Sequence, residues 1–65
     1  MAEYTNSQIK ELIQEHIHNE EDRRMLFARL VNGKTFEQIS EMAGKDVKTV
    51  RKRIHRGEEI LFKHL

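Results

Sequence analysis

The sequence predicts a compact all-α domain of four helices, and two observations support this fold class. Apolar residues recur at helical spacing along the chain, whereas no comparable stretch alternates apolar and polar residues as a strand would. The chain has 65 residues and contains neither cysteine nor proline. With no disulfide or thiolate zinc site to brace so small a chain, regular helix packing is the expected solution. We therefore expect one domain over residues 1–65, with helices at roughly 6–18, 20–32, 36–43 and 46–63.

The first two expected helices are indicated by apolar spacing and by a capping signal. In the first, the apolar residues fall at i, i+3, i+4 and i+8, namely Ile9, Leu12, Ile13 and Ile17. Asn19 is a good N-cap for the second, and the acidic residues at 20–22 favour the positive end of a helix dipole. Gly33 supplies a left-handed stop after its apolar residues, which are Met25, Leu26, Phe27, Leu30 and Val31.

The third and fourth expected helices each follow a capping residue. Thr35 and Gln38 are spaced as a capping box, and Gly44 ends this short helix of about two turns. Asp46 caps the last helix, whose apolar stripe consists of Val47, Val50, Ile54, Leu61 and Leu65. Gly57 is the predicted weak point, because glycine inside a helix costs up to ~1 kcal/mol relative to alanine.

Positive charge is concentrated in one short segment of the chain. Residues 1–32 carry four basic and six acidic side chains, whereas residues 33–65 carry eight basic and five acidic ones. Within residues 45–56 there are six basic groups and a single acidic one. This local density, rather than the net charge of +1, indicates a polyanionic partner.

The short connection at residues 43–46 has the size and chemistry of the turn in a helix-turn-helix unit, with the last helix as the recognition helix. If Val50 and Ile54 face inward, helical spacing turns the polar residues outward. Lys and Arg donate to guanine O6 and N7, and Thr offers a hydroxyl or a methyl group. The candidates for contact with base edges are Lys48, Thr49, Arg51 and Lys52. The candidates for contact with the DNA backbone are Lys34, Thr35, Lys45, Arg53, His55 and Arg56.

The segment from Glu20 to Leu61 resembles region 4 of bacterial sigma factors, especially the extracytoplasmic-function type. The residues that match the family pattern are Gly33, Thr35, Ile39, Glu41, Gly44, Thr49, Val50, Arg53, His55 and Arg56. Ser40, Ala43, Lys45 and Gly57 depart from it, which implies a thinner core at the turn. The resemblance implies double-stranded DNA as a partner, and RNA polymerase as a possible second one. A complete sigma factor needs a further domain, and 65 residues leave no room for one. We therefore expect a small transcriptional regulator, and the resemblance implies a bacterium, phage or mobile element as its source.

Alternatives remain open on fold relationship, function and assembly. The LuxR-type helix-turn-helix domain is a close second resemblance, since it shares four helices and a similar length. A different function is a protein-interaction module that mimics sigma region 4 and binds polymerase or a partner regulator without reading DNA. The apolar tail formed by Ile60, Phe62 and Leu65 is wider than one inward stripe, which makes it a candidate homodimer surface.

Catalysis, cofactors and metal binding are not expected. The chain has no cysteine and no glycine-rich phosphate loop, and no serine is spaced beside a histidine or carboxylate. His16 and His18 point to different helix faces, and no third ligand lies at useful spacing. The longest apolar run, at residues 25–28, is far shorter than the roughly 20 residues of a membrane-spanning helix. We expect a cytoplasmic protein without membrane contact.

Overall fold

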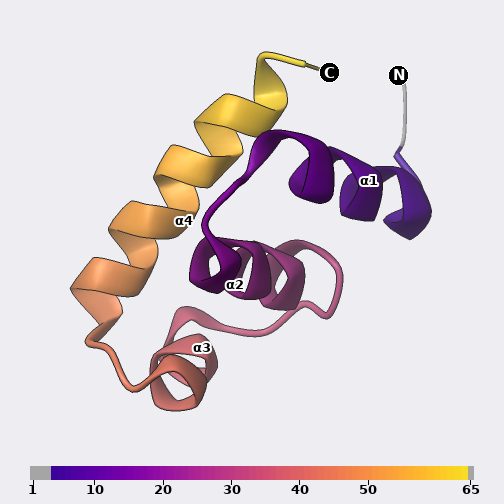
Figure 1. Cartoon of the computed structure of the whole chain (residues 1–65). Helices are drawn as coiled ribbons and strands as arrows, with labels where there is room; N and C mark the ends of the chain where they lie inside the picture. Colours follow the sequence, from indigo (N-terminus) through magenta and orange to yellow (C-terminus); the bar gives the residue numbers. More distant parts are fainter. Residues whose placement is uncertain (1–3, 65) are drawn as a thin grey trace.

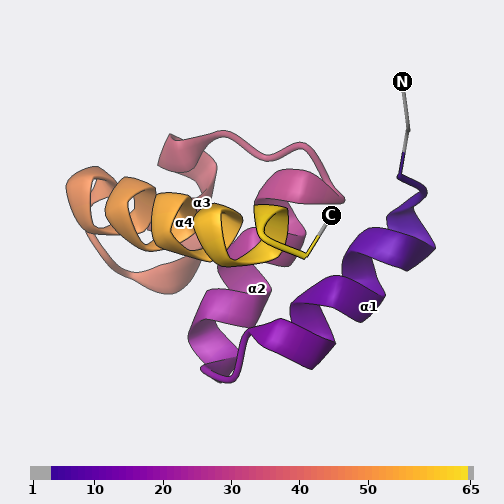
Figure 2. The same cartoon turned by 90° about the horizontal axis from the view of Figure 1, so that it is seen from above.

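The structure, a computed structural model, describes residues 4–64 and consists of four helices, with no strand among those residues. They are α1 (Asn6–His16), α2 (Glu20–Leu30), α3 (Phe36–Ala43) and α4 (Val47–Phe62). The long helix α4 lies along one side of α2, with α3 near its N-terminal end and α1 toward its C-terminal end (Figures 1 and 2). The predicted all-α fold class is confirmed. Among residues 4–64, none of the helices has the length and apolar character of a membrane span.

Local capping explains where the helices begin. Asn19 Oδ1 accepts the Asp22 N–H at 3.0 Å, and Asp46 Oδ1 accepts the Thr49 N–H at 2.8 Å. Thr35 forms a capping box with Gln38, as predicted, and Thr5 forms an equivalent box at the start of α1. The sequence signal at Thr5 was open to the same interpretation but was missed.

Three of the helices are shorter than predicted. The helix α1 ends at His16 because Ile17 is extended, with φ −109° and ψ 115°. The helix α2 ends at Leu30, and α4 runs from residue 47 to residue 62. Although Ile17 lies outside the helix, its side chain is buried in the core. The early end of α1 lets this residue turn inward.

One apolar core receives side chains from all four helices and from the segment after α1. It is formed by Ile13, Ile17, Met25, Leu26, Ala28, Ile39, Val50, Ile54 and Leu61. The predicted inward stripe of α4 is buried at residues 50, 54 and 61, while Val47 is half-buried. Burial of apolar area is the main stabilising term for a domain of this kind. The core therefore fixes which side of α4 faces solvent.

Gly57, the predicted weak point of α4, lies where α4 approaches α2 closely. The glycine is buried, and a Cβ atom built there would lie 2.4 Å from Leu26 Cδ1 and 3.0 Å from Leu26 Cγ. Both distances are shorter than carbon–carbon contacts of about 3.5 to 4.0 Å. Glycine at this position thus permits the close approach of α4 to α2, which offsets its poor helix propensity.

Specific contacts hold the turns on either side of α3. Gly44 takes the left-handed conformation at φ +67° and caps α3. The Ser40 hydroxyl donates to the Lys45 carbonyl across this turn. On the other side, Arg29 Nη1 donates to the Lys34 carbonyl at 3.0 Å. The Ser40 contact stabilises the turn between α3 and α4, and the Arg29 contact links α2 to the loop that leads into α3.

Candidate nucleic-acid interface

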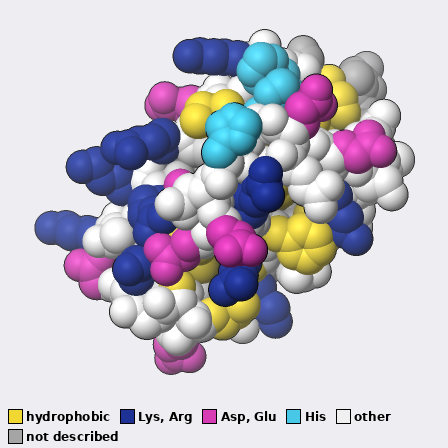
Figure 3. Space-filling view, in the orientation of Figure 1, with side chains coloured by type: hydrophobic (Ala, Val, Ile, Leu, Met, Phe, Trp, Pro, Cys, Tyr) yellow, Lys and Arg dark blue, Asp and Glu magenta, His cyan; other side chains and the backbone are white. Residues whose placement is uncertain are grey.

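The outward face of α4 carries a row of exposed polar and basic side chains. Lys48, Thr49, Lys52 and Arg56 are all exposed, opposite the buried residues of the same helix. Figure 3 shows Lys and Arg side chains projecting from the edge of the molecule along the N-terminal part of α4. Acidic side chains of α4 occur only at residues 58 and 59, in its C-terminal half. The N-terminal half therefore presents positive charge alone.

Arg51 and Arg53 lie on opposite flanks of α4. Because they are two residues apart, their directions differ by about 200° around the helix axis. Arg51 faces the N-terminal end of α3, where its Cζ lies 5.5 Å from the centroid of the Phe36 ring. Arg53 faces the N-terminal end of α2. The two arginines therefore have different surroundings, although both come from the same basic segment.

Arg53 is held by a cluster of acceptors at the start of α2. Its Nη1 donates to Glu21, and its Nη2 lies 2.7 Å from Asp22 Oδ1. A longer contact of 3.3 Å joins Nη2 to Asn19 Oδ1, the oxygen that also caps α2. The side chain of Arg53 is 23% exposed, and that of Asp22 is 26% exposed. This partly desolvated cluster ties the middle of α4 to the first turn of α2.

The charges in this cluster shift the pKa values in the directions that pairing predicts. The hydrogen bond from Arg53 lowers the pKa of Glu21 below its ordinary value of 4.5, and Lys45 at 3.8 Å adds to the effect. The same hydrogen bond raises the pKa of Arg53. The phosphate contact predicted for Arg53 stays a prediction, and in it Arg53 shares its guanidinium between a phosphate and the acceptors of this cluster. Its guanidinium pairs with two carboxylates, because the fold brings α2 to that flank.

Arg51 has an aromatic rather than an acidic neighbour. The centroid of the Phe36 ring lies 4.4 Å from Cζ of Arg29 on α2 and 5.5 Å from Cζ of Arg51 on α4. The His55 ring, one turn after Arg51, is 6.2 Å from the same ring and tilted by 50°. Sequence reasoning missed Phe36 and Arg29 as neighbours of this face, since their approach to α4 depends on tertiary packing.

The remaining predicted backbone contacts lie around the same end of the molecule. Thr35 is exposed at the start of α3, and Lys34 beside it is half-buried. Lys45 is half-buried and lies near Glu21. His55 is exposed, with Nδ1 3.6 Å from Glu58 Oε1. The start of α3 thus lies beside the middle of α4, where the Phe36 and His55 rings are 6.2 Å apart.

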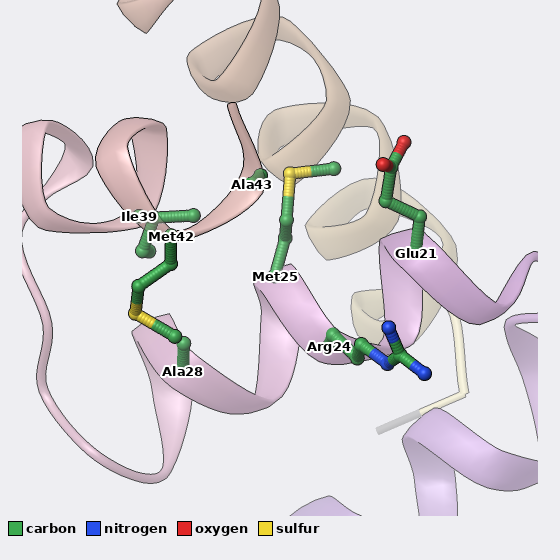
Figure 4. A pocket seen from close by; sticks show the side chains of 7 residues that line it. All are labelled: Glu21, Arg24, Met25, Ala28, Ile39, Met42 and Ala43. Atoms are coloured by element: carbon green, nitrogen blue, oxygen red, sulfur yellow. The ribbon is translucent and has the colours of Figure 1, made fainter. Parts of the chain in front are cut away.

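A separate apolar groove of about 180 Å³ lies between α2 and α3 (Figure 4). Its walls are Met25, Ala28, Ile39, Met42 and Ala43. Met42 is 66% exposed, and its side chain reaches across toward Ala28. Ala43 contributes only a methyl group, which agrees with the thinner turn core that the sequence implied. Glu21 and Arg24 form the polar rim.

The residues of the candidate dimer surface at the end of α4 differ in their burial. Ile60 is half-buried and packs against the core, whereas Phe62 is 58% exposed. Leu65 lies outside the described residues. Nearby, the rings of His16 and His64 stack at 3.7 Å with an angle of 1° between their planes. Among residues 4–64, no group of three or more potential metal ligands is assembled.

Comparison with known proteins identifies a match over most of the chain. The family described as Sigma-70, region 4 matches residues 19–61. This range spans α2, α3 and nearly all of α4, including the turn between the last two helices. No curated protein and no solved structure matches the chain.

Proposed function

The chain belongs to the sigma-70 region 4 family, whose domains are DNA-binding helix-turn-helix modules, and we propose that it is a DNA-binding transcriptional regulator. In this proposal α4 enters the major groove, while the start of α3 lies over the DNA backbone. The observation that carries the proposal is the outward face of α4. Its basic side chains are exposed, its opposite side is buried in the core, and its N-terminal half has no acidic residue.

The proposed base contacts come from Lys48, Thr49, Arg51 and Lys52. All four are exposed on the first part of α4, which is the part of a recognition helix that reaches base edges. Lysine and arginine donate to guanine in the major groove, and threonine contacts thymine or a polar edge. Among residues 4–64, the three charged members of this set, Lys48, Arg51 and Lys52, form no ion pair.

The proposed phosphate contacts come from Lys34, Thr35, Lys45, His55 and Arg56. Thr35 begins α3, where the free backbone N–H groups and the helix dipole favour an anion. Arg56 is exposed on α4 one turn beyond Lys52. Arg53 stays a proposed phosphate contact as well, although its guanidinium also pairs with Glu21 and Asp22.

The test separates base contacts from general attraction to DNA. A preferred duplex is first selected from a random pool with the wild-type protein. The variant Arg51→Ala is then expected to weaken binding to the selected duplex by about five- to hundredfold, and binding to a random duplex much less, since a good bidentate base contact contributes about 1–3 kcal/mol. Lys63→Ala removes an equal charge beyond α4 and serves as the matched control. Equal losses on both duplexes for Arg51→Ala would refute the proposed base contact.

A second candidate function is supported by the apolar groove between α2 and α3. Region 4 domains bind RNA polymerase as well as DNA. The exposed Met42 and the apolar floor beside it are suited to an apolar segment of a protein partner. In this candidate function the groove binds RNA polymerase, and α4 does not need to read DNA. The resemblance to sigma region 4 implies the flap domain of the polymerase β subunit as the part that is bound.

One NMR titration distinguishes the two candidates. Labelled protein is titrated with random duplex DNA and then with the isolated β flap domain, each at two salt concentrations. Salt-sensitive shifts at Thr35 and residues 45–56 on addition of DNA support the regulator. If DNA shifts no resonance of α4 and the flap domain shifts resonances around Met42, the protein is a polymerase-binding module and not a DNA-binding regulator. A single module buries only about 600–1,000 Å² on DNA, so low salt is needed to detect a monomer.

A further inference from the structure

Phe36 occupies a position that the proposed contacts with DNA leave unexplained. It is the first residue of α3, is half-buried, and packs against the core. Its ring lies within 5.5 Å of the guanidinium carbons of Arg29 from α2 and Arg51 from α4. One aromatic side chain therefore connects three helices next to the face proposed to bind DNA.

The contact with Phe36 restrains Arg51 without occupying its donors. An aromatic ring within about 6 Å attracts a guanidinium through its quadrupole. A carboxylate in the same place would accept the N–H groups, as Glu21 does for Arg53. The ring carries no such acceptor, so the five N–H donors of Arg51 stay available for a nucleic-acid acceptor. Among residues 4–64, no carboxylate lies within ion-pair distance of Arg51.

The ring is itself held in a defined place. Arg29 lies over it at 4.4 Å and also donates to the carbonyl of Lys34, two residues before Phe36. Arg29 thus fixes both the ring and the loop that leads into α3. Arg29 belongs to α2, and this helix is anchored in the core through Leu26 and Ala28. The Phe36 ring that Arg51 contacts is therefore part of the packed fold.

We infer that Phe36 is a positioning residue for DNA recognition, because its ring holds the guanidinium of Arg51 in a restricted set of rotamers before DNA binds. A restrained side chain loses less conformational entropy when it forms its contacts. The inference rests on the proposed function, since it requires that Arg51 contact DNA. It assigns Phe36 an effect on affinity and specificity through Arg51 and no contact of its own with a base.

The experiment compares ring-free and ring-retaining variants. Phe36→Leu is expected to weaken binding to the selected duplex by about two- to fivefold, the size of one exposed cation–π contact, and Phe36→Tyr is expected to retain wild-type affinity. In the Phe36→Leu background, Arg51→Ala is expected to cost less than it does in the wild type, because the two side chains act through one contact. Phe36→Met is a second ring-free variant if Phe36→Leu is poorly folded.

A spectroscopic measurement in the absence of DNA separates positioning from a general structural role. The Arg51 Nε–H resonance of the free protein is expected to move when the ring is removed and to stay in place in Phe36→Tyr. An unchanged resonance in the ring-free variants, or losses of Phe36→Leu and Arg51→Ala that simply multiply, would overturn the inference. If Arg51→Ala weakens specific binding and Phe36→Leu does not, the inference alone fails. If Arg51→Ala has no effect on binding, both the inference and the proposed base contact fail.

Discussion

Replacing Gly57 by alanine tests whether the close approach of α4 to α2 determines this position. At an exposed site inside a helix, the change from glycine to alanine stabilises a protein by about 1 kcal/mol. At Gly57 the new methyl carbon would lie 2.4 and 2.9 Å from the two methyl carbons of Leu26, and 3.0 Å from its Cγ. Leu26 is 0% exposed and so has no solvent into which to move.

The structure sets the sign and size of the expected change. Overpacking a well-packed core by one methyl group costs about 1–3 kcal/mol. After the gain in helix propensity is subtracted, we expect Gly57→Ala to lower the free energy of unfolding by about 1 kcal/mol. For a domain of this size, that corresponds to a decrease in Tm of about 4–8 °C.

The assay is thermal and urea unfolding followed by circular dichroism, with two controls. Lys52→Gly and Lys52→Ala, compared at an exposed site of the same helix, measure the propensity difference without a packing change. Leu26→Ala removes the atoms that clash, so Gly57→Ala in that background is expected to be neutral or stabilising. An increase in Tm for Gly57→Ala in the otherwise wild-type protein would refute the reasoning. It would mean that Leu26 moves aside at little cost and that glycine is not required there.

Three further predictions concern charge and capping. Arg56→Ala should weaken binding to selected and random duplexes alike and lower the slope of log K against log salt by about one; an unchanged slope would exclude a phosphate contact. Because Arg53 lowers the pKa of Glu21, the ionised Glu21 carboxylate stabilises the fold above its ordinary pKa of 4.5, and this stabilisation is lost as the pH falls below that value. The Tm of the wild type should therefore fall more steeply than that of Glu21→Gln between about pH 5 and pH 3, and parallel curves would contradict the ion pair. Thr5→Ala and Thr35→Ala should each lower the free energy of unfolding by about 0.5–2 kcal/mol, measured in urea, but only Thr35→Ala should also weaken DNA binding; equal affinities of the two variants for DNA would remove Thr35 from the interface.

Local sequence patterns were enough to predict the four helices and the basic face of α4. Helix starts depend on contacts three residues apart, so Asn19, Thr35 and Asp46 were recognisable as caps without any tertiary information. Apolar periodicity likewise predicted that Val50, Ile54 and Leu61 are buried, and the polar positions between them followed. The helix ends were less well predicted. A residue such as Ile17 is apolar whether it continues a helix or leaves it to reach the core.

The contacts of each basic residue within residues 45–56 depend on how the helices pack. Arg51 and Arg53 have the same side chain, two positions apart, and helical spacing assigned one to base edges and the other to the DNA backbone. It did not indicate which residues surround each of them in the folded chain. Arg53 meets Glu21, 32 residues away, because α2 packs against one flank of α4, while Arg51 meets Phe36 on the other flank. The reason for glycine at position 57 likewise lies in the tertiary structure, because the Leu26 side chain leaves no room there for a Cβ atom. Ion pairs, cation–π contacts and close helix approach depend on distances between segments far apart in the chain, and these distances are fixed only when the core packs.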